Sequence, residues 1–174
     1  LNEYFSEMTA IALEYGATID KYIGDAMMVF FGDPDSKGER EDARACVNMA
    51  LRMRDKISNL QLKWQKQGFS EPFQVRMGMN TGYCNVGNFG SDQRLTYTII
   101  GSEVNVAQRL ETSAESGGIL MSYETYAHAQ DLIEVEQLES ISMKGVNREI
   151  KVFSVLNELR ERNKKSLASQ TLKT

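Results

Sequence analysis

Three polar side chains have the type and spacing to hold an anionic ligand. Arg76 interrupts an otherwise apolar run of residues. A half-buried arginine requires an anion, and its forked donors suit phosphate, although a structural carboxylate is the commoner partner. Asn105 and Arg109 lie four residues apart in a segment with helical periodicity, so both project from one face and could grip one ligand together. This pair alone is a weak signal.

Charged residues near strand ends form a second group of candidates. Asp25 follows a glycine in a tight turn, where a carboxylate is held rigidly and stays open to solvent or a ligand. Lys21 precedes it by four residues in the strand that leads into the turn, and Lys144 stands at another strand end. On residue type alone, a turn aspartate and solvated lysines are the commoner interpretation. His128 falls on a polar helix and is assigned no role.

Hydrophobic periodicity predicts the elements that must position these side chains. Helices are expected at residues 1–15, 39–67, 103–114 and 123–132, and strands at 17–22, 26–31, 73–79, 83–89, 94–100, 118–121, 138–144 and 149–155. The turn around Gly24 joins the first two strands into a hairpin, and Thr81-Gly82 is expected to join the next two. Strands that arrive as hairpins between helices indicate an α+β fold with helices packed on a sheet.

Composition narrows the class of protein. A chain of 174 residues, 41% hydrophobic and 25% charged, fits one globular domain. The net charge of −4 excludes a broad basic face for nucleic acid or an anionic membrane, so any phosphate must be held locally. No apolar run approaches the ~20 residues of a bilayer span. Cys46 and Cys84 have neither disulfide nor metal spacing, which fits a reducing, cytoplasmic location.

Five ordered segments carry a resemblance to a known family. KYIGDAMMVFFG, VRMGMNTG, VGNFG, YTIIGSEVNVAQR and MKG together resemble the catalytic domain of class III nucleotidyl cyclases, in particular the bacterial adenylate cyclases. The resemblance places a catalytic domain at residues 1–156 and leaves 157–174 as a charged tail. It implies a ferredoxin-like α+β fold with a mainly antiparallel sheet, and a head-to-tail homodimer. ATP would be converted into 3′,5′-cyclic AMP and pyrophosphate at the dimer interface.

The resemblance also implies a role for each candidate. Asp25 would bind Mg²⁺ or Mn²⁺, two of which occupy each complete site. Arg76 and Lys144 would bind phosphates, whereas Asn105 would orient the ribose and Arg109 would meet the charge on the α-phosphate. Two cations lower the pKa of the 3′-hydroxyl and neutralise the leaving pyrophosphate, so catalysis rests on position and charge.

Lys21 and Thr98 correspond to the pair that reads the purine base. Adenine offers an acceptor at N1 and a donor at N6, which match a lysine ammonium and a hydroxyl acceptor, whereas guanine reverses this pattern. Lys21 therefore favours ATP, although Thr98 is a neutral acceptor where many members have an aspartate. One protomer would supply Asp25 and Arg76, and its partner Lys21, Thr98, Asn105, Arg109 and Lys144, so a lone monomer should be inactive.

Asp25 corresponds to the second of the two metal-binding aspartates of the family. The first lies in the opening strand of the family, in a D-I-x-G-F-T-like segment, which precedes the helix with which this sequence begins. The sequence therefore predicts a metal site one carboxylate short and an uncovered sheet edge. Weak or absent activity is expected of this chain, and regulatory domains are expected upstream in the parent protein.

Three alternatives stay open. A guanylate cyclase is the first, and Lys21 argues against it. A non-catalytic nucleotide-binding or dimerisation module is the second; the lost aspartate favours it, but the retained polar set exceeds what a scaffold requires. A ferredoxin-like RNA binder is the third, and the acidic pI of about 5.2 counts against it.

Overall fold

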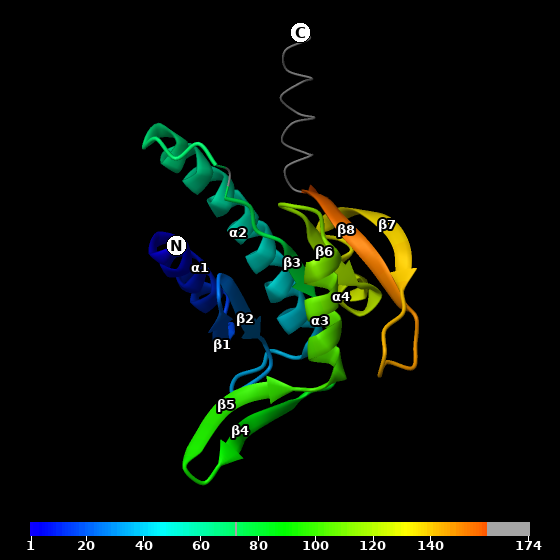
Figure 1. Cartoon of the computed structure of the whole chain (residues 1–174). Coiled ribbons are helices and arrows are strands. Elements are labelled where there is room, and N and C mark those ends of the chain that lie inside the picture. Colours follow the sequence, from blue (N-terminus) through cyan, green and yellow to red (C-terminus); the bar gives the residue numbers. More distant parts are fainter. Residues whose placement is uncertain (72, 160–174) are drawn as a thin grey trace.

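The computed structural model describes residues 1–71 and 73–159. In chain order the elements of this part are α1 (Asn2–Glu14), β1 (Thr18–Ile23), β2 (Ala26–Phe30), α2 (Glu39–Lys66), β3 (Met77–Met79), β4 (Asn85–Ser91), β5 (Arg94–Ile100), α3 (Ser102–Ser113), β6 (Ile119–Ser122), α4 (Tyr123–Ala129), β7 (Ile133–Ile141) and β8 (Ile150–Glu158) (Figure 1). The predicted α+β fold and its helices are confirmed, with α4 ending three residues early. The last strand pair begins earlier than expected, at Ile133.

A four-stranded sheet with the order β3-β6-β8-β7 lies at the centre of the fold. β3 runs parallel to β6, whereas β8 is antiparallel to both β6 and β7. β1 with β2 and β4 with β5 form two further antiparallel hairpins, each a sheet of its own. The sheet structure is therefore mainly antiparallel, as expected, but it is divided into three parts.

The predicted hairpin between residues 73–79 and 83–89 is wrong. β3 contains only Met77–Met79 and pairs with β6, while β4 pairs with β5. β6 is buried along its whole length. A parallel strand is normally buried in this way, and pairing with β6 places the apolar side chains of β3 in the core. Beyond β3, Asn80 donates to the backbone carbonyl of Glu103 and accepts from Ser122 Oγ, which carries the chain out of the sheet instead of into a tight turn.

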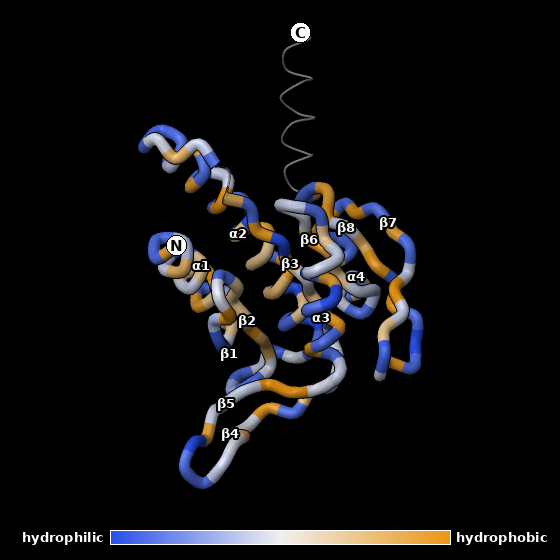
Figure 2. Tube along the Cα trace, in the orientation of Figure 1, coloured by the Kyte–Doolittle hydropathy of each residue, from blue (hydrophilic) through white to orange (hydrophobic). Residues whose placement is uncertain are grey.

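Helices cover both faces of the central sheet. Val47 and Leu51 of α2 pack with Met121 of β6 on one face, together with α4. Val106 and Leu110 of α3 pack on the other face, against neighbouring residues of β6 and β8. The opposite side of α2 packs against α1. Helix α2 therefore has α1 and the β1–β2 hairpin on one side and the central sheet on the other (Figure 1). Hydropathy alternates along α2, as two-sided packing with exposed flanks requires (Figure 2).

The C-terminal boundary expected from sequence falls inside a strand. β8 ends at Glu158, so residue 157, where the charged tail is expected to begin, pairs with Glu134 of β7. Residues 160–174 of that tail lie outside the described residues. Within the described residues, none of the helices has the length and apolar character needed to cross a membrane.

Candidate functional site

Asp25 lies at the end of the β1–β2 hairpin, which is fixed against α1. Gly24 adopts a φ of +62°, a conformation that glycine takes without steric cost, and this permits the tight turn. The Tyr22 hydroxyl is 2.7 Å from Thr9 Oγ1, and its ring meets the ring of Phe5 edge-on at 4.8 Å. The turn is therefore held in place while the Asp25 side chain stays exposed, available to a ligand.

The structure brings Lys21 and Thr98, the two candidates for base reading, to one carboxylate. Thr98 Oγ1 on β5 donates a hydrogen bond of 3.0 Å to Asp20 Oδ2 on β1. Lys21 Nζ lies 3.5 Å from the same oxygen. The Asp20 side chain is fully buried, whereas that of Lys21 is 46% exposed. An ammonium group with access to solvent and a fixed hydroxyl therefore lie side by side.

Sequence reasoning did not identify Asp20 as part of this group. A register shift between Ile19 and Lys21 leaves Asp20 as the extra residue of a bulge, without a partner on β2. A bulge changes the direction of a side chain relative to strict alternation, so periodicity carries no signal for this position. Its only sequence signal is an acidic residue inside a β-forming run.

Asn105 and Arg109 lie on the exposed face of α3, as the spacing predicts. Both residues are exposed, while Val106 and Leu110 on the opposite face are buried against the sheet. Gly78 of β3 allows α3 to lie close to the sheet, because the helix backbone packs directly on the glycine. The two polar side chains are thus displayed on a helix whose position the core fixes.

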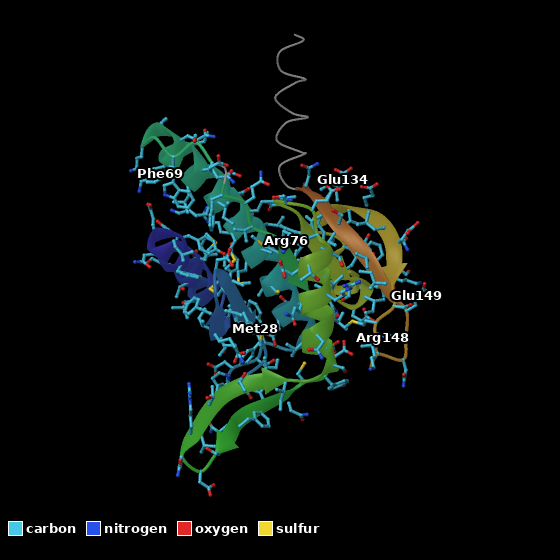
Figure 3. All side chains as sticks on the ribbon, viewed as in Figure 1. Met28, Phe69, Arg76, Glu134, Arg148 and Glu149 are labelled. Carbon is cyan, nitrogen blue, oxygen red and sulfur yellow. The ribbon has the colours of Figure 1, made fainter. Side chains whose placement is uncertain are left out.

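Arg76 has the structural partner that its residue type favours. Its Nη2 lies 3.1 Å from Glu111 Oε1 of α3, and Nη1 donates to the Thr112 carbonyl oxygen at 3.5 Å. The side chain remains 45% exposed. Arg76, labelled in Figure 3, therefore reaches the C-terminal half of α3. Asn105 lies near the start of that helix.

Lys144 lies in the loop between β7 and β8, which is tied to the start of α3. Arg148 lies in the same loop (Figure 3). It makes two hydrogen bonds of 2.8 Å to Glu103 and a third of 3.2 Å to Glu124. The hydrogen bonds from Arg148 lower the pKa of Glu103, and Glu103 in turn raises the pKa of Arg148. Lys144 itself is exposed. The loop and the α3 face are thus held together through Glu103.

His128 belongs to a surface ion network. Its Nε2 lies 3.3 Å from Glu39 Oε1, and its carbonyl oxygen accepts a hydrogen bond from Arg44. These contacts connect α4 to the start of α2. They explain the residue structurally, in keeping with the absence of an assigned role.

The described residues of this chain bring only part of the candidate set together. Lys21 joins Thr98, and Asn105 joins Arg109, whereas Asp25 lies in the turn of the hairpin that carries Lys21, a sheet that shares no ladder with β5 or with the sheet beside α3. No group of three or more His, Cys, Asp or Glu side chains in residues 1–71 and 73–159 could hold a metal ion. Two pockets beside α2 are lined by none of the candidates.

Comparison with known proteins finds a family and relatives that match most of this chain. The family described as "Adenylate and Guanylate cyclase catalytic domain" matches residues 1–157. Adenylate cyclase 1 of Rhizobium meliloti is 28% identical over 165 residues, covering 94% of this chain and 24% of the relative. Guanylate cyclase 32E of Drosophila melanogaster is 31% identical over 149 residues, covering 83% of this chain and 12% of the relative.

The solved structures agree with the fold. The crystal structure of the adenylyl cyclase CyaB from P. aeruginosa superposes with a TM-score of 0.85 and 49% sequence identity, covering 90% of this chain and 80% of that chain. The chain thus spans less than a quarter of the length of these two curated relatives, but most of the solved domain. The match to the family over residues 1–157 and the similar fold lead to one conclusion: this chain belongs to the adenylate and guanylate cyclase catalytic domain family.

Proposed function

We propose that this domain is an adenylate cyclase that converts ATP into 3′,5′-cyclic AMP and pyrophosphate. The observation that carries the proposal is the convergence of Lys21 and Thr98 on one carboxylate. An ammonium donor beside a hydroxyl acceptor complements N1 and N6 of adenine. The reaction forms a bond between the ribose 3′-oxygen and the α-phosphorus and breaks the bond from that phosphorus to the bridging oxygen of the pyrophosphate. The 3′-hydroxyl loses its proton in this step, so the products are cyclic AMP, pyrophosphate and one proton.

Asn105 and Arg109 supply the groups at the reacting phosphate. Their shared exposed face on α3 suits a ribose hydrogen bond from the amide and charge stabilisation from the guanidinium. Arg76 and Lys144 bind the remaining phosphates. Binding by Arg76 requires that a phosphate compete with Glu111, and its half-exposed side chain makes this exchange possible.

Asp25 is the residue of this chain that would hold Mg²⁺ or Mn²⁺. Its exposed carboxylate is the type of oxygen ligand that such hard cations prefer, so the residue fits the role. A bound cation supplies positive charge at the phosphates and lowers the pKa of the 3′-hydroxyl. One carboxylate is an incomplete ligand set, so further oxygen ligands must come from the nucleotide or from another segment.

A homodimer completes the proposed site. Asp25 and Arg76 of one protomer would face Lys21, Thr98, Asn105, Arg109 and Lys144 of the other. The placement of Asp25 in the β1–β2 turn and of Asn105 and Arg109 on α3 supports this division, because these elements belong to different parts of one chain. Activity should therefore rise more steeply than linearly with protein concentration until the dimer saturates.

The test is cyclic nucleotide production by the purified chain at high protein concentration with Mn²⁺. ATP and GTP are supplied in parallel, and the products are separated by chromatography. Cyclic AMP as the main product supports the proposal. Cyclic GMP in equal or greater yield contradicts the base assignment and retains the cyclase family.

Guanylate cyclase is the second candidate, and one observation favours it. The acceptor at Thr98 is a neutral hydroxyl, which discriminates less strongly between purines than a carboxylate would. The GTP arm of the assay decides between the two candidates. A chain that binds both nucleotides and converts neither, even under these conditions, would instead be the silent binding module.

A further inference from the structure

Asp20 is a buried carboxylate that packing alone does not explain. Its side chain has no exposed area, and Oδ1 is buried without a hydrogen-bond partner among the described residues. A buried carboxylate oxygen left unpaired destabilises a fold, and an apolar residue of similar size would avoid this cost. Asp20 also occupies the bulge of β1, which directs it toward β5 instead of toward β2.

The hydrogen bond to Thr98 determines which part of the hydroxyl faces a ligand. A hydroxyl carries one hydrogen and two lone pairs, and a carboxylate can only accept. Because the Thr98 hydrogen is directed to Asp20 Oδ2, the lone pairs remain for another donor. Thr98 is 7% exposed, so its hydroxyl hydrogen has little access to water as an alternative acceptor.

We propose that Asp20 is a positioning residue for purine selection, which fixes the Thr98 hydroxyl as a hydrogen-bond acceptor and anchors the Lys21 ammonium beside it. This inference rests on the proposed adenylate cyclase function. A fixed acceptor receives the N6 amino group of adenine but opposes the O6 acceptor of guanine. Without Asp20 the hydroxyl turns freely and can donate to O6, so the discrimination against GTP falls.

The Lys21 contact acts in the same direction. Its Nζ lies 3.5 Å from Asp20 Oδ2 while the side chain is half-exposed, so the ammonium keeps free donors for a ligand. An ammonium held at that point donates to N1 of adenine and opposes the N1–H of guanine. One buried carboxylate therefore sets the polarity of the Thr98 hydroxyl and the position of the Lys21 ammonium, the two groups that meet the base.

The experiment compares Asp20→Leu with Asp20→Asn. Leucine removes the acceptor and retains the branching and the number of side-chain heavy atoms, whereas asparagine retains an oxygen that can still accept from Thr98. We measure the dissociation constants of ATP and GTP and the ratio of cyclic AMP to cyclic GMP formed. Asp20→Leu should reduce the preference for ATP about tenfold, the scale of one lost hydrogen bond to a charged group. Asp20→Asn should retain most of the preference.

Two further variants separate positioning from folding. Thr98→Val removes the hydroxyl, and in that background Asp20→Leu should alter the nucleotide preference at least threefold less than in the unaltered chain. The pair Asp20→Leu with Thr98→Val leaves no polar side chain at these two positions and should fold even if Asp20→Leu alone does not. Asp55→Asn, which removes an exposed carboxylate on α2, is the control and should leave the preference unchanged.

The outcomes distinguish this inference from the proposed function. If the unaltered chain prefers ATP and Asp20→Leu prefers it equally, the positioning role is wrong and the cyclase assignment stands. The same conclusion follows if Asp20→Leu lowers the affinity for both nucleotides by one factor. If the unaltered chain binds neither nucleotide, the proposed function fails and the inference falls with it.

Discussion

Glu103 connects the start of α3 to the loop between β7 and β8, and we expect its charge to stabilise the fold. Two hydrogen bonds from Arg148 and one from Asn80 favour the ionised form and lower the pKa of Glu103 from 4.5. A lowered folded-state pKa means that the contribution is complete above the unfolded value and is lost as the pH falls through the folded value. The stabilisation from Glu103 is therefore lost at pH values below 4.5, the pKa of an unperturbed glutamate.

Glu103→Gln should destabilise the chain by about 1–3 kcal/mol at pH 7, because a charge-assisted pair becomes a neutral one. The difference from the unaltered chain should shrink as the pH falls below about 4.5 and vanish once Glu103 is protonated. Urea unfolding at several pH values measures this. Glu115→Gln, at an exposed position, is the control; a constant difference across the pH range would contradict the pairing.

Lys21 should decide nucleotide preference by charge. Lys21→Glu places an acceptor where N1 of adenine needs a donor, so the ratio of cyclic AMP to cyclic GMP should fall at least tenfold. Lys37→Glu makes the same charge change at an exposed loop position and should leave this ratio unaltered. An equal loss of both products in Lys21→Glu would assign the lysine to general phosphate attraction, not to base reading.

At this scale the sequence predicted some groups and missed others for identifiable reasons. The spacing of Asn105 and Arg109 was sufficient to place both on one exposed face. For Arg76 the sequence predicted a carboxylate partner but not which residue supplies it. Glu111 lies 35 positions further along the chain, and local sequence patterns do not reveal contacts over such a separation. Asp20 was missed because a bulge, not alternation, determines where its side chain points.

α3 rests on β3 at one glycine, and this contact determines where its polar face lies. A Cβ atom on Gly78 would lie 2.9 Å from Glu111 Cα and closer still to the Ala107 carbonyl oxygen. These are backbone atoms, which cannot turn aside as a side chain would. Any larger residue must push the helix away from the sheet.

Gly78→Ala should therefore destabilise the chain by about 3 kcal/mol and reduce cyclic nucleotide formation further than stability alone explains. Gly87→Ala in β4 is the matched control. A Cβ there would meet only Phe89 Cε2 at 3.9 Å, so its effect should stay within about 0.5 kcal/mol. Chemical denaturation and product assays on both variants test this; equal stability of the two would show that α3 can shift without cost.

The elements differ in how far sequence could predict them. The long helices have a strong periodicity, and the β1–β2 hairpin has a glycine turn between two β-forming runs. β3 is only three residues long and pairs in parallel with β6, about 40 positions later. Alternation within 73–79 cannot reveal such a partner, since a parallel neighbour reached through a crossover leaves no local turn signal.

At the scale of the whole molecule, the described part of the chain forms three separate sheets. The hairpin that carries Asp25 and the sheet next to α3 share no ladder. The resemblance predicted the family and the α+β fold, which the comparisons confirm. The dimer stays a prediction. Association depends on how the surfaces of two chains fit together, and local sequence patterns carry no information about that fit.

Complementation between two inactive variants gives the sharpest test of that dimer. Asp25→Asn should abolish the contribution of one protomer, and Arg109→Ala that of the other. In a mixed dimer both defects fall in one of the two sites, and the second site is intact. Random exchange makes half of the dimers mixed, so an equal mixture should regain about a quarter of the unaltered activity. Mixing Asp25→Asn with Asn105→Ala should rescue equally, because the amide and the guanidinium share one protomer.

Mixing Asn105→Ala with Arg109→Ala is the matched control for this arrangement. Both residues lie on the same face of α3, so every mixed dimer keeps one defect in each site and no activity should return. Product formation after co-incubation, with size-exclusion chromatography to verify association, measures all three mixtures. Rescue in the control mixture would mean that Asn105 and Arg109 act in different sites. No rescue in the first two mixtures, with dimers present, would place Asp25 and Arg109 of one chain in the same site and overturn the shared-interface arrangement.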